Sequence, residues 1–163
     1  MTLQRRLASL SDPIPVGIIG VGAMGRGLAY QTTLTPGIRC SALADIDIRR
    51  PIAWAEAMDV PYEVVETVDE MAHAIHRGVL AICTDGAMIS EASGIDIVLE
   101  SSSSIQAAGR FAESALRNRK HLVLMNAEID LTFGPYLAAL ADEQDVTYTS
   151  CDGDQHGVIK RLW

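Results

Sequence analysis

Short apolar runs alternate with segments of helical periodicity along most of the chain. Two of the runs, residues 79–83 and 95–99, are too short for helices and too continuous for a sheet with one face in water, so we expect strands inside a covered sheet. We expect further strands at residues 14–19, 38–44, 121–125 and 146–149, and helices at residues 24–32, 68–77, 105–118 and 135–141.

Local signals mark where some of these helices begin and end. Thr67 and Glu70 have the spacing of a capping box, and Gly78 is expected to end the helix that follows. Pro135 is expected to open the last helix, because proline suits the first helical turn, and Asp130 is its expected cap.

Alternation of strands and helices predicts right-handed βαβ units and a parallel sheet with helices on both faces. The expected fold class is therefore α/β, a doubly wound parallel sheet. The chain has 163 residues, a length that suits one domain of ordinary size. We assign residues 1–13 to an N-terminal extension and residues 14–163 to one domain.

One glycine-rich segment follows the first expected strand and opens the first expected helix. It matches the pattern G-x-G-x-x-G in Gly20, Val21, Gly22, Ala23, Met24 and Gly25. Asp45 stands 20 residues after Gly25, at the end of the second expected strand, where this fingerprint places an acid. Together these conditions predict a Rossmann domain that binds NAD or NADP through these residues and Asp45.

Each glycine of the motif has an expected role. Gly20 takes the tight turn, Gly22 leaves no Cβ between the backbone and a diphosphate, and Gly25 lets the helix pack closely on the strand. The helix N-terminus adds N–H groups and about half an elementary positive charge. The alternative is that the glycines serve only close helix–sheet packing.

Asp45 is expected to accept hydrogen bonds from the adenosine ribose, which favours NAD over NADP. Arg49 and Arg50 follow it, in a helix that Asp47 is expected to cap. Either guanidinium can bind a ribose phosphate, so the choice of cofactor stays open. The alternative is that both arginines lie on a solvated helical turn.

Polar residues also follow three other expected strands, where ligands bind in open α/β sheets. Thr84 and Asp85 follow one, the serine run 101–104 follows another, and Asn126 follows a third. We assign Ser101, Ser102 and Asn126 to the cofactor site. The alternatives are that the serines only cap the next helix and that Asn126 only satisfies loop backbone.

Composition narrows the choice of partner and compartment. The net charge of −8 disfavours nucleic acid. The longest apolar stretch without a charge, residues 13–25, is shorter than the roughly 20 residues that cross a bilayer, so we expect no membrane segment. Three separated cysteines without a Cys-x-x-Cys pair fit neither a disulfide framework nor a zinc site, and favour the cytoplasm.

For most of the histidines and for Cys151, a structural or solvated position is expected. His73 and His76 lie three apart without a third ligand nearby, so we expect a solvated helix face and no metal site. His121 opens a strand and is expected to be structural. His156 is a weak candidate for a proton donor, and Cys151 is expected to be an ordinary loop cysteine.

Four segments carry a resemblance to a known family. They are GIIGVGAMG at residues 17–25, DIVLE at 96–100, KHLVLMNAEID at 120–130 and GDQ at 153–155. In these segments the chain resembles the homoserine dehydrogenase-like oxidoreductases, in the branch also described as deoxyxylulose-phosphate reductoisomerase-like. The resemblance implies that residues 100–103 lie against the nicotinamide ribose and that Asn126 lies beside the nicotinamide.

The family's chemistry is NAD(P)H-linked reduction of a small polar metabolite, with a catalytic and dimerisation domain after the nucleotide-binding domain. By this resemblance we expect a nucleotide-binding domain without its catalytic domain, inactive alone and self-associating as a homo-oligomer; its catalytic residues stay unknown, and a small-molecule substrate would need the missing domain. The alternative is a free-standing, non-enzymatic nucleotide-binding module that assembles with another chain.

Overall fold

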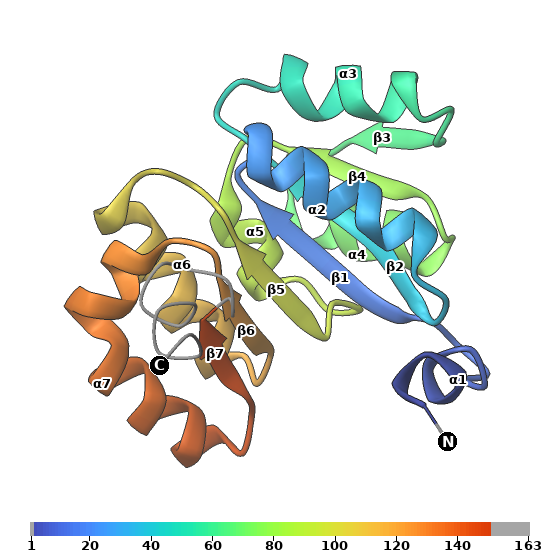
Figure 1. The fold of residues 1–163 in the computed structure, drawn as a ribbon. Helices are drawn as coiled ribbons and strands as arrows, with labels where there is room; N and C mark the ends of the chain where they lie inside the picture. The colour runs from blue at the N-terminus through green and yellow to red at the C-terminus, as the bar shows by residue number, and fades with distance from the viewer. Residues whose placement is uncertain (1, 151–163) are drawn as a thin grey trace.

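A seven-stranded parallel sheet forms the centre of the molecule (Figure 1). The computed structural model describes residues 2–150. The strands are β1 (Ile14–Ile19), β2 (Ile38–Ala44), β3 (Tyr62–Val64), β4 (Leu80–Cys83), β5 (Ile97–Glu100), β6 (His121–Leu124) and β7 (Tyr148–Ser150). Their order in the sheet is β3-β4-β2-β1-β5-β6-β7. The first four strands therefore lie on one side of the sheet and the last three on the other, and the order of strand addition reverses between β1 and β5.

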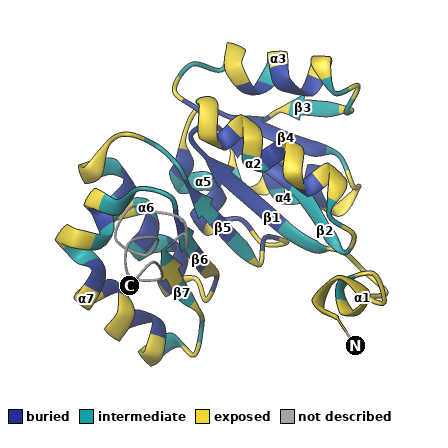
Figure 2. Cartoon of the chain, in the orientation of Figure 1, coloured by how far each residue is buried: buried dark blue, intermediate teal, exposed yellow. Residues whose placement is uncertain are grey.

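Helices cover both faces of this sheet, so its strands are largely buried (Figure 2). On one face, α2 (Ala23–Leu34) and α3 (Arg49–Ala57) enclose a core that includes Ile18, Leu43 and Trp54. On the other face lie α4 (Val68–His76), α5 (Gly86–Glu91), α6 (Ile105–Arg117) and α7 (Ala127–Gln144). The doubly wound α/β fold predicted from the sequence is therefore confirmed.

Several predicted boundaries are confirmed closely. The first two strands have the predicted bounds, and β1 begins at Ile14. The capping box of α4 is present, because Thr67 Oγ1 accepts the Glu70 N–H and the Glu70 carboxylate accepts the Thr67 N–H. For α3 the N-cap is Ile48, one residue after the expected Asp47, but the Asp47 side chain does accept the Arg49 N–H at 3.4 Å and also binds the Arg49 side chain.

The prediction for the last helix was wrong. Helix α7 is 18 residues long and holds Pro135 in its interior, with Asn126 as N-cap in place of Asp130. The residue before a proline normally leaves the helical region because its Cβ meets the proline ring. Here that residue is Gly134, which has no Cβ. Pro135, which was expected to open the helix, is thus tolerated within it.

Three elements were not predicted from the sequence. Helix α1 (Leu3–Leu7) precedes β1, β3 is a three-residue edge strand, and α5 is a six-residue helix capped by Asp85. Each is too short to give a periodic signal. Cys151, His156 and residues 153–155 lie outside the described residues.

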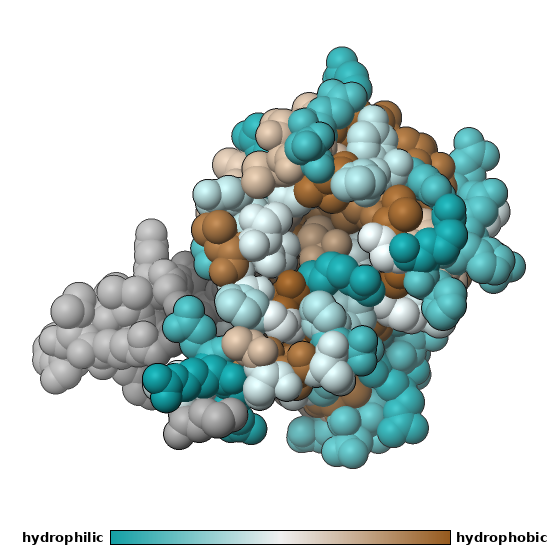
Figure 3. Space-filling model, turned by 90° about the vertical axis from the view of Figure 1, so that its right-hand side faces the viewer, coloured by the Kyte–Doolittle hydropathy of each residue, from teal (hydrophilic) through white to brown (hydrophobic). Residues whose placement is uncertain are grey.

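The histidines of α4 and β6 occupy the solvated and structural positions that the sequence predicts. His73 and His76 are exposed on α4, and the structural role of His121 is confirmed, since its Nδ1 accepts the Thr147 N–H. Among residues 2–150, no helix is long and apolar enough to cross a membrane, and no cluster of three metal-ligating side chains occurs. On the side that bears α1, α2 and α3, apolar side chains show in separate groups between hydrophilic ones (Figure 3).

We expect Thr67→Ala to lower the free energy of unfolding by about 1 kcal/mol, because it removes the hydroxyl that accepts the Glu70 N–H. Urea unfolding would measure this. Thr33→Ala is the control: Thr33 is exposed inside α2 and its hydroxyl donates to a carbonyl of its own helix, so the change should stay within about 0.5 kcal/mol. An equal loss in both variants would contradict the assigned role of the capping box.

Candidate functional site

A cavity of about 250 Å³ opens where β1 and β5 part, at the carboxyl ends of the strands. Ligands in open α/β sheets bind at this point of strand reversal. Its walls come from the ends of β1, β2, β4 and β5 and from the first turns of α6. Of the residues predicted for the cofactor site, it is lined by Gly20, Gly22, Asp45, Ser101 and Ser102. Ala23, Met24, Gly25, Val21 and Asn126 do not line it.

The glycine turn has the geometry that its sequence predicts. Gly20 has φ +88°, and a Cβ there would lie 2.6 Å from the Ser102 nitrogen. A Cβ on Gly25 would lie 1.8 Å from the Gly20 carbonyl oxygen, so α2 and β1 meet backbone to backbone. A Cβ on Gly22 would meet no atom of the described part of the chain within 4 Å. Packing therefore explains two of the glycines but leaves Gly22 facing open space.

Gly22 is also the N-cap of α2, and no side chain within residues 2–150 caps this helix. The first N–H groups of a helix have no partner within it, and they carry the positive end of the helix dipole. In this chain they begin beside the cavity that Gly22 lines. The arrangement suits an anion such as a phosphate.

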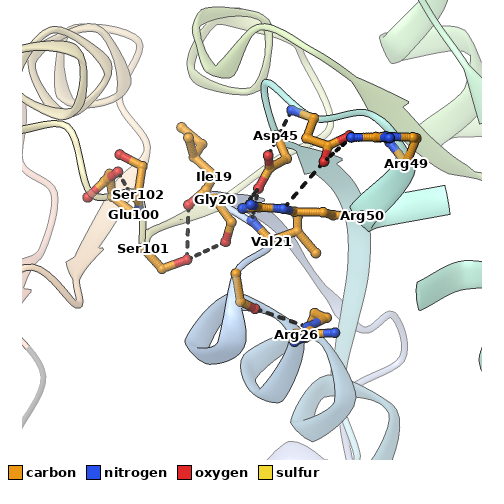
Figure 4. A network of polar contacts seen from close by, with 12 residues as sticks. Ile19, Gly20, Val21, Arg26, Asp45, Arg49, Arg50, Glu100, Ser101 and Ser102 are labelled. Atoms are coloured by element: carbon orange, nitrogen blue, oxygen red, sulfur yellow. Dashed lines mark hydrogen bonds and ion pairs between the residues drawn. The ribbon is translucent and has the colours of Figure 1, made fainter. Parts of the chain in front are cut away.

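Asp45 is buried at the end of β2 and is already engaged by backbone groups (Figure 4). Its Oδ2 accepts the Val21 N–H at 2.7 Å, and its Oδ1 accepts the Asp47 N–H at 2.9 Å. A carboxylate has about four acceptor positions, so each oxygen keeps one for a ligand hydroxyl. Asp45 thus ties the glycine turn to β2 while it lines the cavity.

The two arginines after Asp45 have different surroundings. Arg49 donates to both oxygens of Asp47, at 2.7 and 2.9 Å, and its charge and hydrogen bond lower the pKa of that carboxyl. Arg50 lines the cavity, half-exposed, with Nη1 3.7 Å from Asp45 Oδ2. The sequence left both arginines open as phosphate ligands, and of the two only Arg50 lines the cavity.

Serines 101–104 divide into two roles. Ser104 caps α6 by accepting the Ala107 N–H, so the capping alternative is confirmed for this serine. Ser101 Oγ lies 2.7 Å from the Gly20 carbonyl oxygen and 3.0 Å from that of Ile19, and it donates to this pair. Ser101 and Ser102 therefore form a turn packed against the glycine turn, which we call the serine turn.

Asn126 and Glu100 both form hydrogen bonds with the backbone of the serine turn. Asn126 Oδ1 caps α7 by accepting the Glu128 N–H, and its Nδ2 donates to the Ser102 carbonyl at 3.0 Å. Glu100, fully buried at the end of β5, accepts the Ser102 N–H on Oε1 at 2.9 Å. Sequence reasoning missed this contact; the available signal was an acid at the end of an otherwise apolar strand.

Burial shifts the protonation of Glu100. Desolvation raises the pKa of this carboxyl from 4.5 to about 6, against the opposing effect of the Ser102 hydroxyl and N–H, which favour the carboxylate. Glu100 Oε2 and Ser102 Oγ have no hydrogen-bond partner of good geometry among the described residues. A pair of buried polar atoms is therefore left beside the cavity.

Comparisons with known proteins show likeness at the level of structure only. No family model matches this chain, and no curated protein matches it either. Solved structures do match. Biliverdin reductase from Synechocystis sp. PCC 6803, in complex with biliverdin and NADP+, is 20% identical with a TM-score of 0.68, over 91% of this chain and 42% of that one.

Two further solved structures match a similar share of this chain. A homoserine dehydrogenase from Thiobacillus denitrificans is 22% identical (TM-score 0.62), over 85% of this chain and 29% of that one. GenD2 from gentamicin A biosynthesis, in complex with NAD, is 17% identical (TM-score 0.63), over 85% and 34%. This chain thus spans less than half the length of each protein, and the likeness shows a shared Rossmann-type fold.

We expect the stability of the wild type to fall, relative to Glu100→Gln, by about 2 kcal/mol as the pH rises from 4.5 to above 6. The pKa of Glu100 is higher in the folded than in the unfolded chain, so the folded state binds the extra proton in this window and loses that advantage as the pH rises. Glutamine keeps the acceptor for Ser102 and does not titrate.

Denaturant unfolding of both proteins at a series of pH values would check this difference. Glu143→Gln is the control, because Glu143 is exposed at the end of α7 and is solvated in both states. Parallel pH profiles for the wild type and Glu100→Gln would show that the buried carboxyl does not titrate as described.

Proposed function

We propose that this chain binds NAD or NADP in the cavity between β1 and β5, as the nucleotide-binding part of an oxidoreductase. The supporting observation is Gly22: it caps α2, lines the cavity and faces space that no atom of residues 2–150 fills. A diphosphate there would meet the free N–H groups of the helix without a steric obstacle. The matches to structures with NAD or NADP+ support the same assignment.

The residues around the cavity suit the rest of a dinucleotide. Asp45 offers acceptors to ribose hydroxyls on the β2 side, where Arg50 and the exposed Ile46 also line the cavity. The serine turn lines the β5 side. Bound nicotinamide supplies hydride transfer, whereas these residues bind and orient the two nucleotides.

The reaction we propose is reduction or oxidation of a small polar metabolite, as in the homoserine dehydrogenase-like enzymes. A second candidate is a non-enzymatic nucleotide-binding module that works with another chain. It is favoured by one observation: none of the described residues that line the cavity is a lysine, histidine or tyrosine, the usual proton donors to a carbonyl. Turnover of homoserine or a related hydroxy compound by the 163-residue chain would exclude this module. Cytoplasmic location and self-association stay predictions.

Isothermal titration with NADH and NADPH tests the binding, and Gly22→Asp tests its site. We expect Gly22→Asp to weaken the binding of either cofactor by at least about tenfold, because the new carboxylate would occupy the position of the diphosphate and repel its charge. Its melting temperature should not fall, since aspartate is a favourable N-cap.

Gly27→Asp is the charge-matched control. Gly27 lies one turn along α2, exposed, with open space around its Cα and away from the cavity lining. We expect it to bind cofactor within about threefold of the wild type, with some loss of stability or none. Equal binding by the wild type and Gly22→Asp would contradict the proposed site.

Arg50→Gln tests the choice of cofactor. Removal of this cation leaves Asp45 as the dominant charge at the ribose, so we expect the ratio of NADP to NAD affinity to fall by about tenfold. Arg49→Gln, at a side chain held by Asp47 outside the cavity, should leave the ratio unchanged. Titration of each variant with NADH and NADPH measures this ratio. An unchanged ratio in Arg50→Gln would contradict the role of Arg50 in the choice of cofactor.

A further inference from the structure

Three side-chain hydrogen bonds hold the serine turn, one of them local and two that join it to other parts of the fold. Ser101 Oγ reaches the Gly20 carbonyl at 2.7 Å, which joins the turn to the end of β1. Glu100 holds the Ser102 N–H at 2.9 Å, and Asn126 holds the Ser102 carbonyl at 3.0 Å. Ser102 is therefore fixed at both of its backbone polar groups.

Packing of β5 does not explain an acid at position 100. Glu100 lies on the same face of the sheet as the buried Val98 and Leu124, and its side chain is fully buried. A buried carboxyl carries a desolvation penalty that one backbone hydrogen bond does not offset, as its raised pKa reports. What Glu100 adds over an apolar side chain is its hold on the Ser102 N–H.

Asn126 likewise does more than cap a helix. Its Oδ1 alone would satisfy the first turn of α7, as an aspartate or serine would. Its Nδ2 reaches back to the Ser102 carbonyl, so the N-terminus of α7 and the serine turn are linked through one side chain. Asn126 does not line the cavity, whereas Ser102 does.

The backbone of Ser102 is the part of the cavity wall that this arrangement positions. Ser102 lines the cavity on the β5 side, whereas its Oγ is buried beside the Glu100 carboxyl. A ligand would therefore meet the serine turn as a wall whose shape depends on the hydrogen bonds that hold Ser102.

We propose that Glu100 and Asn126 are positioning residues of the dinucleotide site, which act only through Ser102 and hold its backbone and the adjoining Gly20 turn in the conformation that shapes the cavity wall. This inference rests on the proposed function. It gives Asn126 an indirect role in place of the direct contact with nicotinamide that the sequence predicts. Because the serine turn lies on the β5 side, it concerns the nucleotide opposite the Asp45 ribose site.

Two variants separate this role from general stability. Asn126→Asp keeps an oxygen that caps α7 but removes the donor to the Ser102 carbonyl. Glu100→Ala removes the acceptor of the Ser102 N–H, whereas Glu100→Gln retains one. We expect Asn126→Asp and Glu100→Ala to lower the affinity for the dinucleotide that the wild type prefers by about tenfold. The affinity of Glu100→Gln should stay within about threefold of that of the wild type.

Binding of AMP, measured on the same proteins, provides the decisive comparison. AMP reports only the adenosine side, so its affinity should stay within about twofold in every variant. Thr67→Ala, which loses a helix cap far from the cavity, is the control for lost stability and should bind the dinucleotide like the wild type. If Glu100→Ala does not fold, Asn126→Asp carries the test with Glu100→Gln.

The outcomes distinguish this inference from the function on which it rests. A wild-type chain that binds neither NADH nor NADPH overturns the proposed function, and this inference with it. A wild-type chain that binds, while Asn126→Asp binds equally well, overturns the positioning role alone. Equal loss of AMP and dinucleotide affinity in the variants shows a general structural effect and overturns it as well.

Discussion

The whole site depends on one close contact, in which the backbone at the end of β1 touches both the first turn of α2 and the serine turn. A Cβ at Gly20 or Gly25 would lie within 2.6 Å of another backbone atom, so glycine is needed at both positions. This contact fixes where α2 begins and how far β1 and β5 separate, and hence where the cavity lies. Asp45 reinforces it, because its carboxylate joins the Val21 N–H to the end of β2. The helix N-terminus, the acid and the serine turn are brought together by these few atoms.

Electrostatics at the site differs from that of the chain as a whole. The net charge is −8, yet backbone N–H groups engage both oxygens of Asp45, and Arg50 lies 3.7 Å from one of them. Helix α2 adds the positive end of its dipole at the same edge of the sheet. Local groups therefore offset the acidic background over the few ångströms where a phosphate would sit, and screening by salt weakens the more distant charges.

Local sequence patterns predicted most of the fold, whereas contacts between residues far apart in the sequence could not be predicted from them. The capping box at Thr67 and the glycine motif are each encoded within a few residues, so their geometry followed from spacing alone. The position of Asp45 beside the cavity followed from spacing as well, because one helix and one strand of ordinary length separate it from the glycine motif. The hold of Asn126 on Ser102 joins residues 24 apart on different elements, which no local signal reports. Helix α7 was predicted too short because Gly134 changes what Pro135 permits, an effect that depends on the pair and not on either residue.

Pro135 has a consequence for how α7 opens. It has no N–H to donate to the carbonyl of Leu131, so the ladder of helical hydrogen bonds lacks one rung near the middle of the helix. The exposed position of Leu131 gives water access to this part of the helix. Fraying that starts at Gln144 therefore meets this missing hydrogen bond before it reaches the N-terminal turns. The half of α7 that begins at Asn126, and with it the hydrogen bond from Asn126 to Ser102, lies on the far side of that gap from the fraying end.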